Sequence, residues 1–150
     1  MMILIKPLHN LLLFFSSVFF IAAFFTLRKT LDIHLHDTMF VIGFAHIFMF
    51  AAVYFALLWL LYTFTKKNIW SEKLYRVHIL LSVILVSVII AAALWSNPVL
   101  EAYINDDLHR RATLAAEIGN VIVGALLTLT TVQLLYPLNL IIGLVKHKKH

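Results

Sequence analysis

Four long apolar runs constrain this chain more than any other feature of its sequence. They cover about 11–27, 38–64, 77–95 and 118–145. Each has roughly the ~17–25 residues that a helix needs to cross a hydrocarbon core of ~30 Å. Backbone groups in lipid must be hydrogen-bonded within their own segment, so each run is predicted to be a helix. The sequence therefore predicts an all-α integral membrane protein, a single domain over 1–150 with four transmembrane helices.

The composition supports a membrane protein. The chain is 63% hydrophobic and 13% charged, whereas soluble domains are about half apolar and about a quarter charged. The first run is not expected to be a cleaved signal peptide. Lys6 is the only lysine or arginine before it, and no small-x-small cleavage site follows it. We interpret it as the first membrane span.

The basic residues predict an orientation. Eight of the twelve lie in the N-terminal segment, the 65–76 connection and the C-terminal tail, and four lie in the other two connections. The positive-inside rule then places both termini in the cytoplasm, with 28–37 and 96–111 facing outward. The net charge of +5 is thus interpreted as a topology signal, and the basic residues are expected to contact anionic lipid. Without a basic soluble domain, no nucleic-acid partner is predicted. A bacterial inner membrane is the expected location.

The missing residue types and motifs exclude several functions. The chain has no cysteine, which excludes disulfides, thiolate metal sites and covalent c-type haem attachment. It contains no P-loop, no dinucleotide-binding glycine motif and no nucleophile elbow. No enzyme class is indicated by these patterns.

The outward connections concentrate imidazoles and carboxylates. The first holds Asp32, His34, His36 and Asp37, and the second adds further acids and His109. Nitrogen and oxygen ligands of this kind suit a divalent metal. The alternative is a solvated rim of polar side chains at the membrane surface.

His46 is predicted to lie deep within the second span. Thr38 is a plausible helix start with Asp37 as its N-cap, which would place His46 about 12 Å below the outer end of that helix. An ionisable residue at such a depth suggests a function. A neutral imidazole there could bond a neighbouring helix or bind haem iron, and Gly43 one turn earlier would leave room for a porphyrin.

Three stretches resemble one known family. "LDIHLHDTMFVIGFAHIF" (31–48), "KLYRVHILLSVILVSV" (73–88) and "IGNVIVGALLTLTTVQLL" (118–135) look like the tenth, eleventh and twelfth helices of haem-copper oxidase subunit I. The first span stands where the ninth helix would be. The chain thus resembles the C-terminal four-helix region of that family, helices nine to twelve.

The resemblance implies roles for individual residues. His46 matches the ligand of the low-spin haem, whereas Phe44 stands where the family has the ligand of the oxygen-reactive haem. Asp32 matches an acid near the haem propionates, and His36 and Asp37 match a metal site beside them. The pair Arg110 and Arg111 is similar to an arginine pair that meets the propionates.

The lead hypothesis is therefore a b-type haem protein that transfers electrons or carries haem in a respiratory membrane. It would not reduce oxygen itself, since Phe44 replaces one ligand and the copper-ligating helices of the family have no counterpart. His46 is the predicted axial ligand. Alternatives are a haem-free structural or assembly subunit, and a metal-handling protein that uses His34, His36 and Asp37.

A homo-oligomer is also predicted. His46 of a second subunit would lie at the same depth in a two-fold dimer, whereas His78 is expected too near the opposite end to be the second ligand. The family's pseudo-threefold arrangement suggests a trimer instead, and other respiratory-chain subunits are possible partners. Within the fourth span, Gln133 is expected to need a buried partner, and Pro137 is expected to kink the helix.

Overall fold

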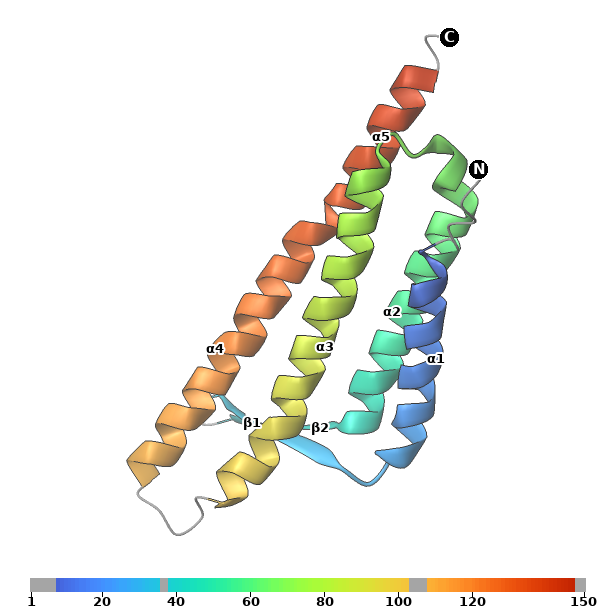
Figure 1. Cartoon of the computed structure of the whole chain (residues 1–150). Helices are drawn as coiled ribbons and strands as arrows, with labels where there is room; N and C mark the ends of the chain where they lie inside the picture. The colour runs from blue at the N-terminus through green and yellow to red at the C-terminus, as the bar shows by residue number, and fades with distance from the viewer. Residues whose placement is uncertain (1–7, 36–37, 103–107, 148–150) are drawn as a thin grey trace.

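The computed structural model describes residues 8–35, 38–102 and 108–147. Most of this part of the chain is helical (Figure 1). The elements, in order, are α1 (Asn10–Phe25), β1 (Thr30–Leu35), β2 (Thr38–Gly43), α2 (Phe44–Thr65), the 3-10 turn η1 (Lys66–Asn68), α3 (Glu72–Ala102), α4 (Leu108–Gln133) and α5 (Leu135–His147).

The helices pack as two antiparallel pairs. α1 lies along α2, and α3 lies along α4 (Figure 1). α4 and α5 form one long rod that is interrupted at Leu134. The interruption confirms the effect expected of Pro137, because its missing N–H leaves the carbonyl of Gln133 without its helical partner.

Three helical segments are long and apolar enough to cross a membrane: Phe44–Asn68, Glu72–Ser96 and Ala116–Lys146. The predicted helices are confirmed for the runs 11–27, 77–95 and 118–145 in most of their length, and for the second run from Phe44 onward. α1 is shorter, with 16 residues, or about 24 Å at 1.5 Å per residue. α3 is longer than the predicted span, with 31 residues.

The start of the second span differs from the prediction. Thr38 does not begin a helix, because Thr38–Gly43 is a strand that pairs antiparallel with β1, from Thr30 opposite Gly43 to Leu35 opposite Thr38. The backbone of Gly43 is still extended (φ −65°, ψ 131°), and α2 begins at Phe44, whose N–H donates to the carbonyl of Lys29 at 2.9 Å. The fold is therefore helical with one two-stranded hairpin, and the expected span 38–64 begins six residues later.

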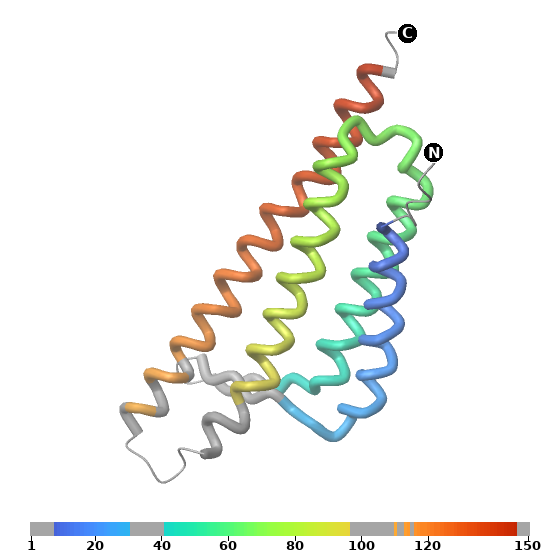
Figure 2. The backbone as a smooth tube through the Cα atoms, in the orientation of Figure 1, coloured from blue at the N-terminus to red at the C-terminus, as the bar shows by residue number. Residues whose placement is uncertain are grey.

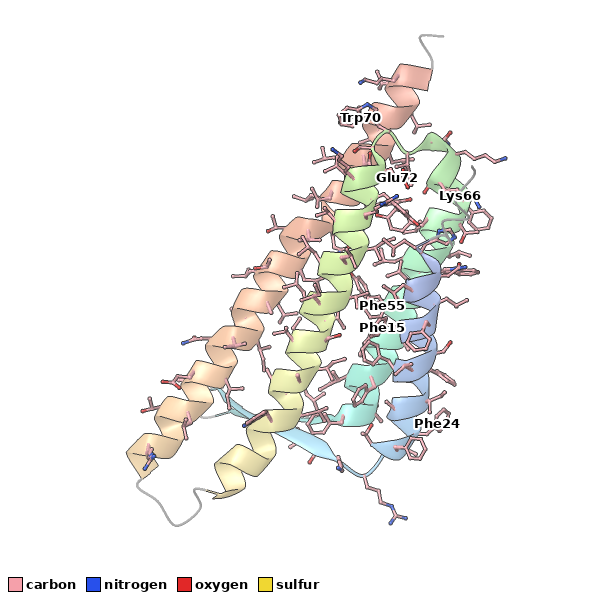
Figure 3. All side chains as sticks on the ribbon, in the orientation of Figure 1. Phe15, Phe24, Phe55, Lys66, Trp70 and Glu72 are labelled. Carbon is pink, nitrogen blue, oxygen red and sulfur yellow. The ribbon has the colours of Figure 1, made fainter. Side chains whose placement is uncertain are left out.

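The core lies between α1, α2 and α3 and is rich in phenylalanine. Phe19 and Phe55 stack with ring centroids 5.7 Å apart, and Phe48 packs on Phe19 at 6.0 Å. Figure 3 shows Phe15 and Phe55 at the α1–α2 contact. Large apolar side chains also cover the outside, as at Phe25 and Phe50, which are 82% and 76% exposed. An apolar exterior of this kind suits lipid rather than water.

The two ends of the bundle differ in construction (Figure 1), and Figure 2 shows the α2–α3 connection beside the C-terminal helix. At one end, here called the terminal end, the α2–α3 connection meets α5. At the other, here called the hairpin end, β1 and β2 cross the bundle and β1 contacts α3. The first turns of α2 and α4 also lie at the hairpin end.

Candidate functional sites at the two ends of the bundle

The hairpin end gathers the residues that the sequence singled out. Asp32 and His34 lie in β1, opposite Val41 and Met39. Arg110 is exposed in the first turn of α4 and Arg111 follows it. His36 and Asp37 lie outside the described residues, as do the side chains of Asp32, His34 and Arg111.

A metal cluster is not formed by the described part of the chain. Among the side chains that the structure describes, no three of His, Asp or Glu come close enough together to hold an ion. The predicted outer metal site depends on His36 and Asp37, so it stays a prediction.

His46 is nearer the end of its helix than the sequence suggested. Because α2 begins at Phe44, His46 is two residues in, about 3 Å along the axis rather than about 12 Å. Its side chain is exposed, and neither ring nitrogen is hydrogen-bonded to a described residue. A buried imidazole that bonds a neighbouring helix is therefore not what the structure shows.

Gly43 accommodates the imidazole of His46 itself. A Cβ atom at position 43 would lie 2.9 Å from Nδ1 of His46, closer than non-bonded atoms tolerate. The absence of a side chain at Gly43 thus lets the ring fold back over the last residue of β2. From the sequence, this space beside Gly43 was expected to admit a porphyrin.

An apolar groove lies on the α1–α2 surface in line with His46. Its volume is about 380 Å³, and its lining consists of small and apolar residues: Ser16, Ser17, Phe20, Ile21, Met49, Ala52, Val53 and Ala56. Met49, Val53 and Ala56 follow His46 by 3, 7 and 10 residues, which places all four on one face of α2. The buried hydroxyl of Ser16 is occupied, because it donates to the carbonyl of Ala52 at 2.8 Å.

A second polar site, toward the terminal end, surrounds His78. The His78 side chain is fully buried. Its Nδ1 lies 2.7 Å from the hydroxyl of Tyr62, and its Nε2 lies 3.2 Å from Oε1 of Gln133. An amide oxygen can only accept, so Nε2 carries the proton and Nδ1 accepts from Tyr62. Both nitrogens are therefore engaged within the bundle, and His78 has none left for a metal.

Gln133 completes this cluster. Its amide nitrogen donates to Ser82 at 3.3 Å and to the carbonyl of Leu129 at 3.4 Å, so the partner expected for Gln133 is found. The cluster joins α2, α3 and α4 through side chains alone. Sequence reasoning missed it because Tyr62, His78 and Gln133 are far apart in the chain; only Ser82, one turn after His78, gave a local signal.

The α2–α3 connection is held by Asn139 of α5. The side chain of Asn139 is buried; its Oδ1 accepts from the N–H of Ser71 at 2.8 Å and its Nδ2 donates to the carbonyl of Ser71 at 2.9 Å. Gly143, one turn later, touches the backbone carbonyl of Asn68, and a Cβ there would clash with that oxygen. The connection and α5 therefore form one interlocked unit.

His9, just before α1, is fastened to α3. Its N–H donates to the hydroxyl of Tyr75 at 2.9 Å, and the same hydroxyl lies 3.0 Å from its Nδ1. Burial lowers the pKa of His9, and the positive charge of Lys66 lowers it further. His9 is thus held in its neutral form near neutral pH.

No protein-family model, characterised protein or solved structure matches this chain in comparisons with known proteins. The resemblance to haem-copper oxidases therefore rests on the quoted residues alone.

Proposed function

We propose that the chain is a membrane-embedded subunit in which α1, α2, α3 and the α4–α5 rod each cross the bilayer. The support is the length and apolar surface of three of these segments and the packing of α1 along α2. The terminal end, with most of the basic residues, faces the cytoplasm and the hairpin end faces outward. A bacterial inner membrane is the location that suits this arrangement.

The function that the site favours is binding of a b-type haem, with His46 as an axial ligand. One observation carries this proposal: an exposed imidazole without a hydrogen-bond partner stands in line with the apolar groove between α1 and α2. A neutral imidazole nitrogen is a good iron ligand, and an apolar wall suits a macrocycle. When bound, haem supplies one-electron chemistry, and the chain's part is to bind and orient it.

The groove is open, so a second subunit is needed to cover the other side of the haem. In a two-fold dimer, His46 of each subunit lies at the same level, and the two imidazoles are equivalent by symmetry. A trimer is the arrangement suggested by the family resemblance. Either assembly serves electron transfer or haem carriage, alone or with other respiratory subunits.

Residues at the hairpin end would hold the polar edge of the haem. Arg110 and Arg111 in the first turn of α4 are suited to carboxylates, because guanidinium groups bond them in a bidentate manner. Asp32 in β1 is the acid placed beside them by the resemblance. His34, His36 and Asp37 would hold a divalent metal at the same end.

Oxygen reduction is not part of this proposal. Phe44 stands where the resembled family has the ligand of its oxygen-reactive haem. The side chain of Phe44 is 3% exposed and packs in the core. An apolar ring in that place offers no ligand atom.

A haem-free structural or assembly subunit is the second candidate. The observation that favours it is the hydrogen-bonded cluster of His78, Tyr62 and Gln133. These buried polar groups bond one another and so join three helices. In that case His46 is only a surface residue of α2.

An absorption spectrum separates the two candidates. The full chain is purified in detergent, incubated with haem, and compared with the variants His46→Ala and His9→Gln. We expect a Soret band that is lost or shifted in His46→Ala and kept in His9→Gln, since His9 lies toward the other end. No band in the wild-type chain would favour the haem-free subunit, and a band unchanged in His46→Ala would exclude His46 as a ligand.

A further inference from the structure

The terminal end carries a group of lysines without acidic partners. They are Lys66 and Lys67 in η1, Lys73 in α3 and Lys146 in α5. Glu72 is the acid in this region of the described chain, and it pairs with Arg76 at 2.6 Å. Among the described residues, none of the four lysines forms an ion pair with a carboxylate.

Two segments that are distant in the sequence carry these lysines at the same end of the bundle. Asn68, which follows Lys67, touches Gly143 of α5 through its carbonyl, and Lys146 lies one helical turn beyond Gly143. Direct packing of η1 on α5 therefore places lysines about 80 positions apart in the sequence on two adjoining elements. We call Lys66, Lys67, Lys146 and Trp70 the basic platform.

The platform is rigid. Asn139 holds the backbone of Ser71 on both sides, and the N–H of Trp70 donates to the carbonyl of Asn139 at 3.4 Å. The indole of Trp70 is 47% exposed, and Nζ of Lys146 lies 4.4 Å from its ring centroid. Figure 3 shows Trp70 and Lys66 at this end of the bundle. The backbone around Trp70 and the side chain of Lys146 are therefore held in place, whereas Lys66 and Lys67 are exposed on η1.

The position of the basic platform at the ends of the apolar helices indicates what it binds. The apolar segments Phe44–Asn68 and Glu72–Ser96 end and begin at this connection, so in the membrane arrangement proposed above, on which this inference rests, its lysines lie at the level of the phospholipid headgroups. An exposed tryptophan at the same level is typical of the membrane interface. We infer that the basic platform binds the phosphate headgroup of an anionic phospholipid, a role independent of the haem proposal.

Native mass spectrometry of the full chain in detergent tests this inference, with phosphatidylglycerol and phosphatidylcholine of identical acyl chains as probes. We expect phosphatidylglycerol to be retained preferentially. The double variant Lys66→Gln/Lys67→Gln should weaken its binding by ~5-fold per lysine removed. The matched control Arg28→Gln/Lys29→Gln changes the charge equally at the hairpin end and should keep the preference.

Two outcomes would overturn the inference: equal retention of the two lipids, or equal loss in both double variants. If the lysine variant does not fold, the wild-type chain still decides. Raising the salt to about 0.5 M should then reduce retention of phosphatidylglycerol and leave phosphatidylcholine unchanged; an unchanged preference would overturn the inference.

Discussion

The two ends of the bundle use their polar residues in opposite ways. Toward the terminal end, side-chain hydrogen bonds tie helices and connections together, through His78 to Tyr62 and through Asn139 to Ser71. At the hairpin end, His46 is exposed and bonded to none of the described residues. The contrast between these residues indicates that His78 and Asn139 stabilise the fold, whereas the imidazole of His46 is available to bind a ligand.

The two histidines show the same contrast at the level of single residues. His78 has both nitrogens engaged and no exposed surface, so its removal leaves two buried polar groups unpaired. His46 packs over Gly43 and can be removed without such a loss. If this comparison is correct, substitutions at the terminal end should destabilise the fold, and matched ones at the hairpin end should not.

The largest effect is expected for Gly143→Ala. The new Cβ meets the backbone carbonyl of Asn68, which cannot move aside as a side chain could, so we expect a loss of about 3 kcal/mol in unfolding free energy. Denaturation in detergent micelles, followed by circular dichroism, measures it. Gly119→Ala in α4 is the control, because nothing lies within 4 Å of a Cβ there; equal losses would contradict the comparison.

Replacing His78 by leucine should cost about 2 kcal/mol, because the hydroxyl of Tyr62 and the amide oxygen of Gln133 lose their partner. His46→Leu should change the unfolding free energy by less than ~0.5 kcal/mol, as at an exposed position. The same denaturation experiment compares them. A larger loss for His46→Leu would show that the hairpin end also carries structural polar contacts.

Asn139→Ala should cost about 1 kcal/mol, because the backbone of Ser71 loses both side-chain partners but lies near water at the edge of the bundle. Hydrogen exchange at the amide of Ser71 should accelerate in this variant. Asn120→Ala, at an exposed position of α4, is the control for asparagine loss. An unchanged exchange rate of the Ser71 amide would show that Asn139 does not hold the α2–α3 connection in place.

The smallest effect concerns pH. Because burial lowers the pKa of His9 below its ordinary value of 6.5, the unfolded chain takes up a proton before the folded chain does as the pH falls. The free energy of unfolding is therefore unaffected by the titration of His9 above pH 6.5, and it decreases as the pH falls below 6.5. Thermal melts of the wild type and His9→Gln between about pH 5 and 8 should differ in slope only on the acidic side. Identical slopes would show that His9 does not titrate with folding.

The sequence predicted the helices well because their signal is local. Apolar runs and the position of Pro137 both act within one segment; three of the four runs gave helices long enough to cross a membrane, and the helix is interrupted just before Pro137. Gln133 was expected to need a partner for a similar reason. Which partner it found depends on the packing of α4 against α3, which no local pattern encodes.

The hairpin was missed because the apolar run from 38 and the N-cap candidate Asp37 favoured a helix from Thr38. A local signal existed: Leu31, Ile33 and Leu35 alternate with polar residues, and only two residues separate this stretch from the β-prone run Thr38–Gly43. The error displaced the start of α2 by six residues, and with it the depth of His46. His78 was expected near the opposite end of the bundle from His46, and six residues of α3, about 9 Å, precede it.

In the proposed membrane arrangement, the hairpin also limits how deep α2 can lie in the bilayer. A sheet of two strands has two open edges, and each edge carries backbone N–H and C=O groups that need water or headgroups as partners. The strands β1 and β2 therefore cannot enter the hydrocarbon, and Gly43 holds the first turn of α2 at its boundary. A cofactor bound by His46 would lie within reach of water-soluble electron carriers on that side of the membrane.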